Sequence, residues 1–193
     1  MKRAIIIHCW EASPEYCWYP DAKKKLEEKG FEVKVPAFPD TDHPREDRWV
    51  PFLKKEIGRP DENLVLVGHS VGCITILRYL ETLGEGEKIG GAVLVAGFTD
   101  ALGYDELKNF FDAPIDFEKI KKRSKNGFVA IHSDNDPFVP LKHSDIFKEK
   151  LGAKAIVKHE LGHFSGPIND ETSCLELPEV VASVEKLASS RSG

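Results

Sequence analysis

The chain has 193 residues, 41% of them hydrophobic and 31% charged, which is typical of a globular protein long enough to bury a core. Its formal net charge of −5 disfavours contact with phosphate backbones, so we expect no nucleic-acid partner. No apolar run approaches the roughly 18 residues that a membrane span needs, so we expect no membrane partner either.

The first part of the chain alternates predicted strands with a helix. The apolar run at residues 4–7 stops at His8, too early for the apolar core of a signal peptide, and we expect a first strand there. A helical pattern at 14–29 ends before Gly30, a residue typical of helix C-termini. A second strand, interrupted by charged residues and therefore nearer a sheet edge, is predicted at 31–35.

The middle of the chain contains a strand and helix followed by an irregular segment. A continuous apolar strand at 64–67 runs into a helix that follows Ser70 and ends before Gly84. Beyond the next strand, at 92–96, residues 97–126 contain several aromatic side chains and no strong strand pattern. Because this segment leaves the sheet at the carboxyl end of a strand, where ligands bind in such folds, we expect a small lid or a wall of the substrate pocket.

The last part of the chain returns to regular alternation. Strands are predicted at 128–131 and 154–158, with a helix at 142–151 between them and a final helix beginning near Pro178. We expect a disordered tail at 189–193.

This alternation predicts a doubly wound three-layer α/β/α sandwich around a mostly parallel sheet of about six strands. We expect a single domain over residues 1–188 with a minimal cap or none. Little chain is left for a large cap, so the substrate pocket is expected to be shallow or open.

A serine motif lies between the central apolar strand and the helix after it. Residues 68–72 read Gly-His-Ser-Val-Gly, and the strand-to-helix turn of such a motif is so sharp that only small residues fit at Gly68 and Gly72. The hydroxyl of the central serine then projects above the sheet, and the helix N-terminus faces developing negative charge. The pattern predicts Ser70 as a nucleophile on a turn that also contains His69.

Two carboxylates follow the strand at 128–131, and in this type of site the acid follows the nucleophile along the chain. Asp136 begins a D-x-x-V-P sequence in which Pro137 and Pro140 stiffen the loop. Asp134 lies nearer the strand, where it could instead cap a turn. We favour Asp136 and keep Asp134 as the alternative.

A candidate base follows the last predicted strand. His163 comes after Gly162 on a loop, which is where a catalytic histidine is needed. The stretch from His159 to His163 also spells H-E-x-x-H, a zinc motif that works only on a helix. The preceding strand-like run, Gly162 within the motif and Gly166-Pro167 after it all argue against a helix. We therefore expect no metal site and interpret His159 as an ordinary surface or core residue.

Two backbone N–H groups should stabilise the oxyanion of the reaction. Val71, directly after the nucleophile, supplies the first, and the loop after the first strand should supply the second, with Trp10 as the leading candidate. Simple packing of Trp10 under a mobile loop is the alternative.

The four cysteines form no C-x-x-C pair, and no signal sequence points to an oxidising compartment. We therefore expect reduced thiols and a cytoplasmic location. No motif implies a cofactor.

The motifs resemble a small, lidless branch of the α/β hydrolases that includes retinoblastoma-binding protein 9 and its bacterial relatives. The resemblance rests on residues 8–10, 67–72, 110–117, 134–140 and 161–164, of which 110–117 is the most typical of the branch. It implies a serine hydrolase with esterase-like activity whose acid directly precedes a proline, as Asp136 does. Many relatives have His-Gly where this chain has His8-Cys9, and Cys9 would restrict the backbone of the oxyanion loop.

The sequence thus favours a serine hydrolase that cleaves small carboxylic esters through Ser70, Asp136 and His163 by way of an acyl-enzyme. An amidase or acyltransferase using the same three residues is one alternative, and a non-catalytic protein-binding module on a hydrolase scaffold is another. The expected partner is a small-molecule ester or amide. A protein partner cannot be read from the sequence.

Overall fold

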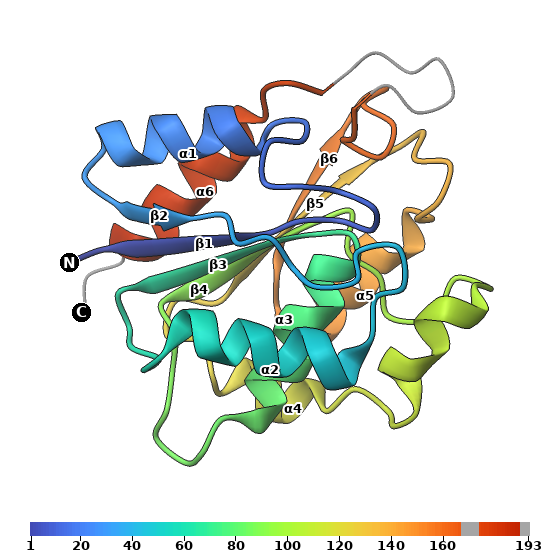
Figure 1. Ribbon diagram of the computed structural model, residues 1–193, viewed down its shortest axis with the longest axis horizontal. Coiled ribbons are helices and arrows are strands. Elements are labelled where there is room, and N and C mark those ends of the chain that lie inside the picture. Colours follow the sequence, from blue (N-terminus) through green and yellow to red (C-terminus); the bar gives the residue numbers. More distant parts are fainter. Residues whose placement is uncertain (167–173, 190–193) are drawn as a thin grey trace.

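The computed structural model describes residues 1–166 and 174–189 and contains a six-stranded sheet (Figure 1). All neighbouring strands are parallel, and their order is β2-β1-β3-β4-β5-β6. The strands are β1 (Arg3–Ile7), β2 (Glu32–Lys34), β3 (Leu64–His69), β4 (Gly91–Val95), β5 (Phe128–Ser133) and β6 (Lys154–Lys158).

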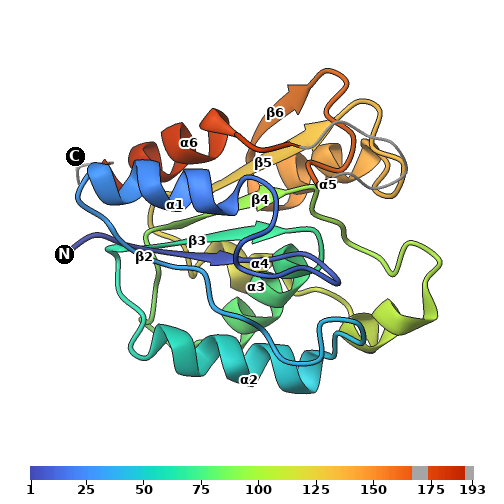
Figure 2. The same ribbon diagram turned by 45° about the horizontal axis from the view of Figure 1, so that its top comes forward.

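Helices cover both faces of this sheet and complete the three layers expected from the alternating pattern (Figures 1 and 2). On one face lie α1 (Tyr19–Glu28) and α6 (Pro178–Ser189). On the other lie α2 (Glu46–Ile57), α3 (Val71–Thr82), α4 (Phe117–Lys121) and α5 (Lys142–Leu151). Within the described ranges, no helix has the length and continuous apolar character that crossing a bilayer requires.

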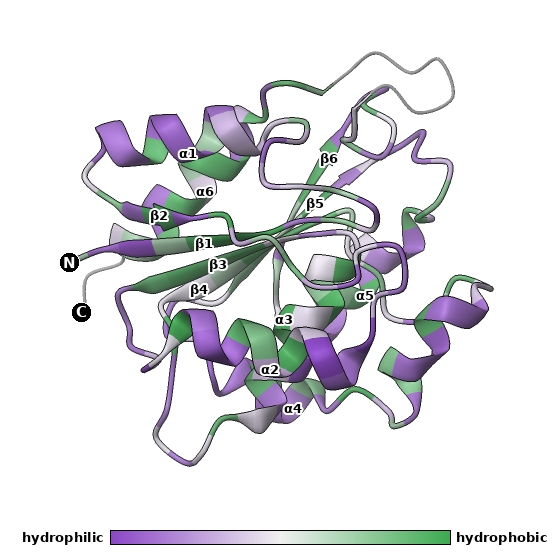
Figure 3. Cartoon of the chain, viewed as in Figure 1, coloured by the Kyte–Doolittle hydropathy of each residue, from purple (hydrophilic) through white to green (hydrophobic). Residues whose placement is uncertain are grey.

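The central strands are apolar along most of their length because helices cover them on both sides, and polar residues enter only at the carboxyl ends of β3 and β5 (Figure 3). Every residue of β3, β4 and β5 is buried, whereas every residue of the edge strand β6 is exposed or partly exposed. Lysines at both ends of β6 are charges that discourage pairing with another chain at this exposed edge. The four cysteines are free and buried.

Two helices differ from the sequence prediction. Helix α1 begins at Tyr19, five residues later than the pattern at 14–29 predicts, because residues 14–18 form turns. No element is predicted from the sequence at the position of helix α2, which contains Pro51. Pro51 faces solvent, and the helix is held by a buried face that includes Trp49 and Leu53.

The predicted disordered tail at 189–193 lies almost entirely outside the described residues. Ser189 is the last residue of α6, and residues 190–193 lie outside the described part of the chain. The tail therefore remains a prediction.

The segment at 97–126 between β4 and β5 packs against α3. It contains a 3-10 helix, η1 (Asp105–Phe111), and then the short helix α4. Arg78, a buried residue of α3, donates hydrogen bonds to the carbonyl oxygens of Phe110, at 2.8 Å, and Ala113. The same guanidinium forms an ion pair with Glu81 at 2.8 Å. One buried cation thus fixes the middle of this segment to the body of the fold.

We expect Arg78→Met to lower the free energy of unfolding by about 2 to 4 kcal/mol, because it leaves buried carbonyl oxygens and a carboxylate without their donor. Urea denaturation followed by circular dichroism measures this loss. Arg48→Met is the matched control: Arg48 pairs with Asp40 at an exposed site, where ion pairs contribute little. Equal losses in the two variants would contradict the anchoring role of Arg78.

Candidate active site

Ser70 lies at the sharp turn between β3 and α3, in a backbone conformation that is strained for any residue with a side chain. Its φ is 55° and its ψ is −118°. An added Cβ at Gly68 would lie 2.7 Å from the backbone nitrogen of Cys73. At Gly72 it would overlap the carbonyl oxygen of Ile7. The predicted requirement for small residues on either side of the serine is therefore a steric fact of this turn.

His163 and Asp136 meet although they come from separate loops, after β6 and β5. The Nδ1 atom of His163 lies 2.8 Å from Oδ2 of Asp136, whose side chain is 1% exposed. The other oxygen of Asp136 accepts the backbone N–H groups of Phe138, at 2.9 Å, and Val139, at 3.0 Å. An ionised carboxylate can only accept, so Nδ1 of His163 carries the hydrogen and Nε2 is left as a proton acceptor.

Asp134, the alternative acid, points elsewhere. Its carboxylate accepts the backbone N–H of Glu160 at 2.9 Å and pairs with Nδ1 of His159 at 2.6 Å. The Glu160 N–H and the His159 ring lower the pKa of Asp134, and the Asp134 carboxylate raises the pKa of His159. Asp134 thus caps the loop after β6 and makes no hydrogen bond to His163.

The H-E-x-x-H stretch is irregular, so its two histidines do not share a helix face. His159 is exposed and paired with Asp134, whereas His163 is buried and paired with Asp136. Among residues 1–166 and 174–189, no group of three or more His, Cys, Asp or Glu side chains is arranged to hold a metal ion.

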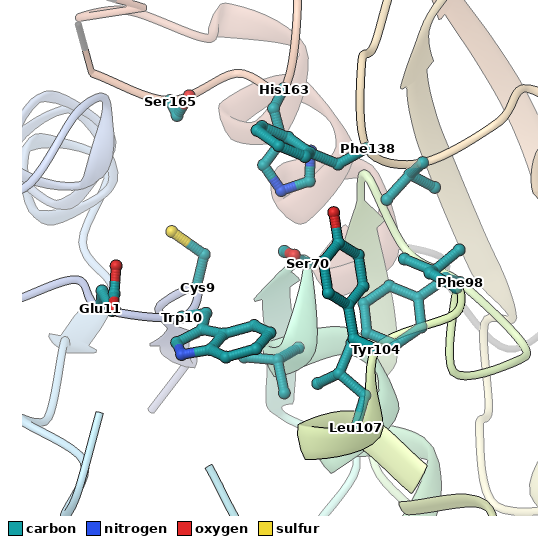
Figure 4. A pocket seen from close by; sticks show the side chains of 13 residues that line it. Cys9, Trp10, Glu11, Ser70, Phe98, Tyr104, Leu107, Phe138, His163 and Ser165 are labelled. Atoms are coloured by element: carbon teal, nitrogen blue, oxygen red, sulfur yellow. The ribbon is translucent and has the colours of Figure 1, made fainter. Parts of the chain in front are cut away.

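Ser70 and His163 open into the same cavity of about 280 Å³ (Figure 4). The His163 ring points from its loop toward Ser70 (Figure 4). No hydrogen bond joins the two side chains in the described structure, which is common before a substrate tightens such a site. The other lining residues are Cys9, Trp10, Glu11, Val71, Phe98, Leu102, Tyr104, Leu107, Phe138, Val139 and Ser165.

The sequence did not identify the apolar wall of this cavity residue by residue. Four of its side chains, Phe98, Leu102, Tyr104 and Leu107, come from the segment at 97–126, which therefore acts as a wall of the pocket. The only signal in the sequence was the position of this aromatic segment at the carboxyl end of a strand.

Both predicted oxyanion donors border the cavity. Val71 is the first residue of α3, so its N–H lacks a partner within the helix. Trp10 lies in the loop after β1, and its indole nitrogen donates to the carbonyl of Asp42 at 2.9 Å. Cys9 keeps a negative φ, which any residue adopts, and Glu11 takes the positive φ of 54° in this loop. Cys9 therefore does not force its own backbone into a strained conformation.

Comparisons with known proteins identify relatives over most of the chain. The family model described as serine hydrolase matches residues 4–185. YdeN of Bacillus subtilis (strain 168) is 34% identical over 164 residues, which make up 84% of this chain and 86% of that protein. The serine hydrolase RBBP9 of Rattus norvegicus is 32% identical over 170 residues, or 86% of each chain.

Solved structures agree with these relatives. The crystal structure of the ydeN gene product from B. subtilis matches with a TM-score of 0.89 and 31% identity, over 97% of this chain and 98% of that one. A monoacylglycerol lipase from Paleococcus ferrophilus matches with a TM-score of 0.65 over 97% of this chain and 94% of its own, but at 18% identity this shows a common fold alone. The architecture is that of the α/β hydrolases.

Replacing Gly72 by alanine should lower the free energy of unfolding by about 2 kcal/mol or more, because the new Cβ overlaps rigid backbone of β1. Gly84→Ala is the control, since a Cβ there would meet only the flexible side chain of Glu87, at 3.3 Å. Urea titration of both variants measures the difference. If Gly72→Ala were as stable as Gly84→Ala, the turn would be looser than the structure shows.

Proposed function

The chain belongs to the serine hydrolase family, and from that premise we propose that it hydrolyses small carboxylic esters. Ser70 is the proposed nucleophile, His163 the general base and Asp136 the carboxylate that orients the base. One observation carries the proposal: a buried carboxylate–imidazole pair, 2.8 Å apart, borders the same cavity as a serine on a strained strand-to-helix turn. Such a serine needs an adjacent base to become nucleophilic.

The first half of the reaction forms an acyl-enzyme. The Oγ atom of Ser70 bonds to the carbonyl carbon of the ester while its proton passes to Nε2 of His163. The carbonyl oxygen becomes an oxyanion, which accepts hydrogen bonds from the N–H groups of Val71 and Trp10. When the carbon–oxygen bond to the alcohol breaks, the alcohol leaves with the proton held by His163.

The second half releases the acid. Water loses a proton to Nε2 of His163 and attacks the acyl carbon, and the ester bond to Ser70 then breaks as the serine regains a proton. The two oxygens of Asp136 take part in three hydrogen bonds, to the N–H groups of Phe138 and Val139 and to Nδ1 of His163, which fix the carboxylate in place. It holds the imidazole in the required tautomer.

The dimensions of the cavity support a small substrate. About 280 Å³ is slightly below the usual range for pockets that bind drug-sized ligands. Aromatic and aliphatic side chains such as Phe98, Leu107 and Phe138 form much of its lining. We expect short, apolar acyl groups to fit this wall better than long lipid chains.

A fluorophosphonate probe should add once to the wild type and not at all to Ser70→Ala, because only an activated serine reacts. Intact-protein mass spectrometry detects the adduct. The kcat for 4-nitrophenyl acetate should fall by about four to six orders of magnitude in Ser70→Ala. Ser165→Ala removes the other serine that borders the cavity and should still form the adduct. Modification of Ser70→Ala, or a folded wild type that does not react, would refute the assignment.

The two competing carboxylates provide a matched pair of variants. Asp136→Asn should reduce kcat by on the order of 10⁴ with little change in KM, because the imidazole then loses its tautomer and its ionic partner. Asp134→Asn changes an exposed carboxylate whose side-chain hydrogen bonds, among the described residues, are to the backbone N–H of Glu160 and the ring of His159, and it should keep most of the rate. Steady-state kinetics distinguishes the two. Equal effects would mean that the acid is misassigned.

A further inference from the structure

Beneath the candidate site lies a chain of buried hydrogen bonds in which neither Ser70 nor Asp136 takes part. The Oη atom of Tyr19 is 3.0 Å from the backbone nitrogen of Cys9 and 2.7 Å from Nδ1 of His69. The Nε2 atom of His69 is 2.7 Å from the carbonyl oxygen of His163. The side chains of Tyr19 and His69 are fully buried. The loop after β1 and the loop of His163, which both border the cavity, are thereby joined through the first residue of α1 and the last residue of β3.

The chemistry of the end groups fixes the direction of every bond in this chain. A carbonyl oxygen can only accept, so Nε2 of His69 carries the hydrogen and donates to His163. Burial lowers the pKa of His69 well below the usual value and keeps the ring neutral, which leaves Nδ1 as an acceptor for the Tyr19 hydroxyl. The lone pairs of Tyr19 then accept the N–H of Cys9. Each donor has one acceptor, and each group has a partner.

The carbonyl side of Cys9 is held as firmly as its N–H. The backbone N–H of Phe38 donates to Nε2 of His8 at 3.1 Å, so the hydrogen of this neutral ring is on Nδ1. That Nδ1–H donates to the carbonyl oxygen of Cys9 at 2.8 Å. Both backbone groups of Cys9 are thus bound to buried side chains, in a loop that belongs to no helix or strand.

Fixing the carbonyl of Cys9 also fixes the next N–H. The peptide between Cys9 and Trp10 is planar and trans, so the Trp10 N–H points opposite to the Cys9 carbonyl. No hydrogen bond from this N–H is made within the described part of the chain. It is therefore an oriented donor without an acceptor among the described residues, at the edge of the cavity that contains Ser70.

We propose that Tyr19 and His69 are positioning residues. They hold Cys9 by its N–H, so that its carbonyl stays bonded to His8 and the Trp10 N–H stays in place as an oxyanion donor, and they tie this loop to the loop of His163. The proposal rests on the proposed function and adds two residues to it that touch neither substrate nor reacting atoms. Oxyanion donors act by being oriented in advance, so release of this loop weakens transition-state binding more than substrate binding.

The test uses a pair of substrates that differ at one atom, 4-nitrophenyl acetate and its thiono analogue, in which sulfur replaces the carbonyl oxygen. Sulfur is a poor hydrogen-bond acceptor, so the thiono ester gains little from the oxyanion donors. Tyr19→Phe removes only the hydroxyl and keeps the ring against Trp18. We expect kcat for the oxygen ester to fall about 10- to 100-fold with KM nearly constant, while the thiono ester changes much less.

The ratio of the two rates separates positioning from general damage. Loss of folded enzyme lowers both rates equally, and fluorophosphonate labelling counts the reactive Ser70 in each sample. Tyr79→Phe is the control, since its buried hydroxyl has no hydrogen-bond partner among the described residues and it should keep the wild-type ratio. An unchanged ratio in Tyr19→Phe, or an equal loss of both rates, would overturn the proposal.

A second variant keeps the test decisive if Tyr19→Phe does not fold. His69→Phe preserves a planar ring but removes both nitrogens, so the Tyr19 hydroxyl loses its acceptor and the orientation of Cys9 is released. A fall in the same ratio supports the proposal, and a wild-type ratio refutes it. A wild type that neither reacts with the probe nor cleaves the oxygen ester would instead refute the proposed function itself, which distinguishes the two failures.

Discussion

The crossing of helix α3 over the end of strand β1 is the constraint on which the rest of the site depends. A Cβ at Gly72 would meet the carbonyl oxygens of Ile7 and His8, so the helix can approach the sheet only at a residue without a side chain. This approach lifts Ser70 above the sheet in its strained conformation. Because Ile7 pairs in register with Gly68, the loop after β1 leaves the sheet next to the serine turn. The steric requirement at Gly72 therefore determines the positions of both Ser70 and the loop after β1.

A parallel sheet explains why residues far apart along the chain meet at this point. The segments that follow β1, β3, β5 and β6 all leave from the carboxyl edge, and they contribute Trp10, Ser70, Asp136 and His163 respectively. The segment after β4 leaves from the same edge and becomes the apolar wall, held from behind by Arg78. Each polar group that this arrangement buries would destabilise the fold without a partner, which is why the hydrogen bonds beneath the site form closed pairs.

The sequence predicts those features that depend on local rules. Gly68 and Gly72 flank Ser70 because the turn leaves no room for side chains, and the continuous apolar runs indicate burial on both faces of the sheet. The fold and the placement of Trp10, Ser70, Asp136 and His163 after strands could therefore be expected from the sequence. Helix α2 is harder to predict because it contains Pro51, a residue that disfavours helix interiors, and it is stabilised by the packing of its buried face rather than by local sequence preference. The contact between Tyr19 and His69 spans 50 positions, and each side chain alone resembles an ordinary core residue. Such contacts exist only after folding and leave no periodic signal.

The same burial that shapes the site also bears on which histidine suits the role of the proposed base. Burial lowers the pKa of four of them: His8, His69, His132 and His143, the last to about 4. A buried imidazolium is stable only beside an ionised partner, and among the buried histidines of the described chain only His163 has a carboxylate within hydrogen-bond distance. His69 is the immediate neighbour of Ser70 in sequence, yet both of its nitrogens bind neutral groups. A proton taken from the serine would have no counter-charge there, which is consistent with the proposed positioning role of His69 and the proposed role of His163 in proton transfer.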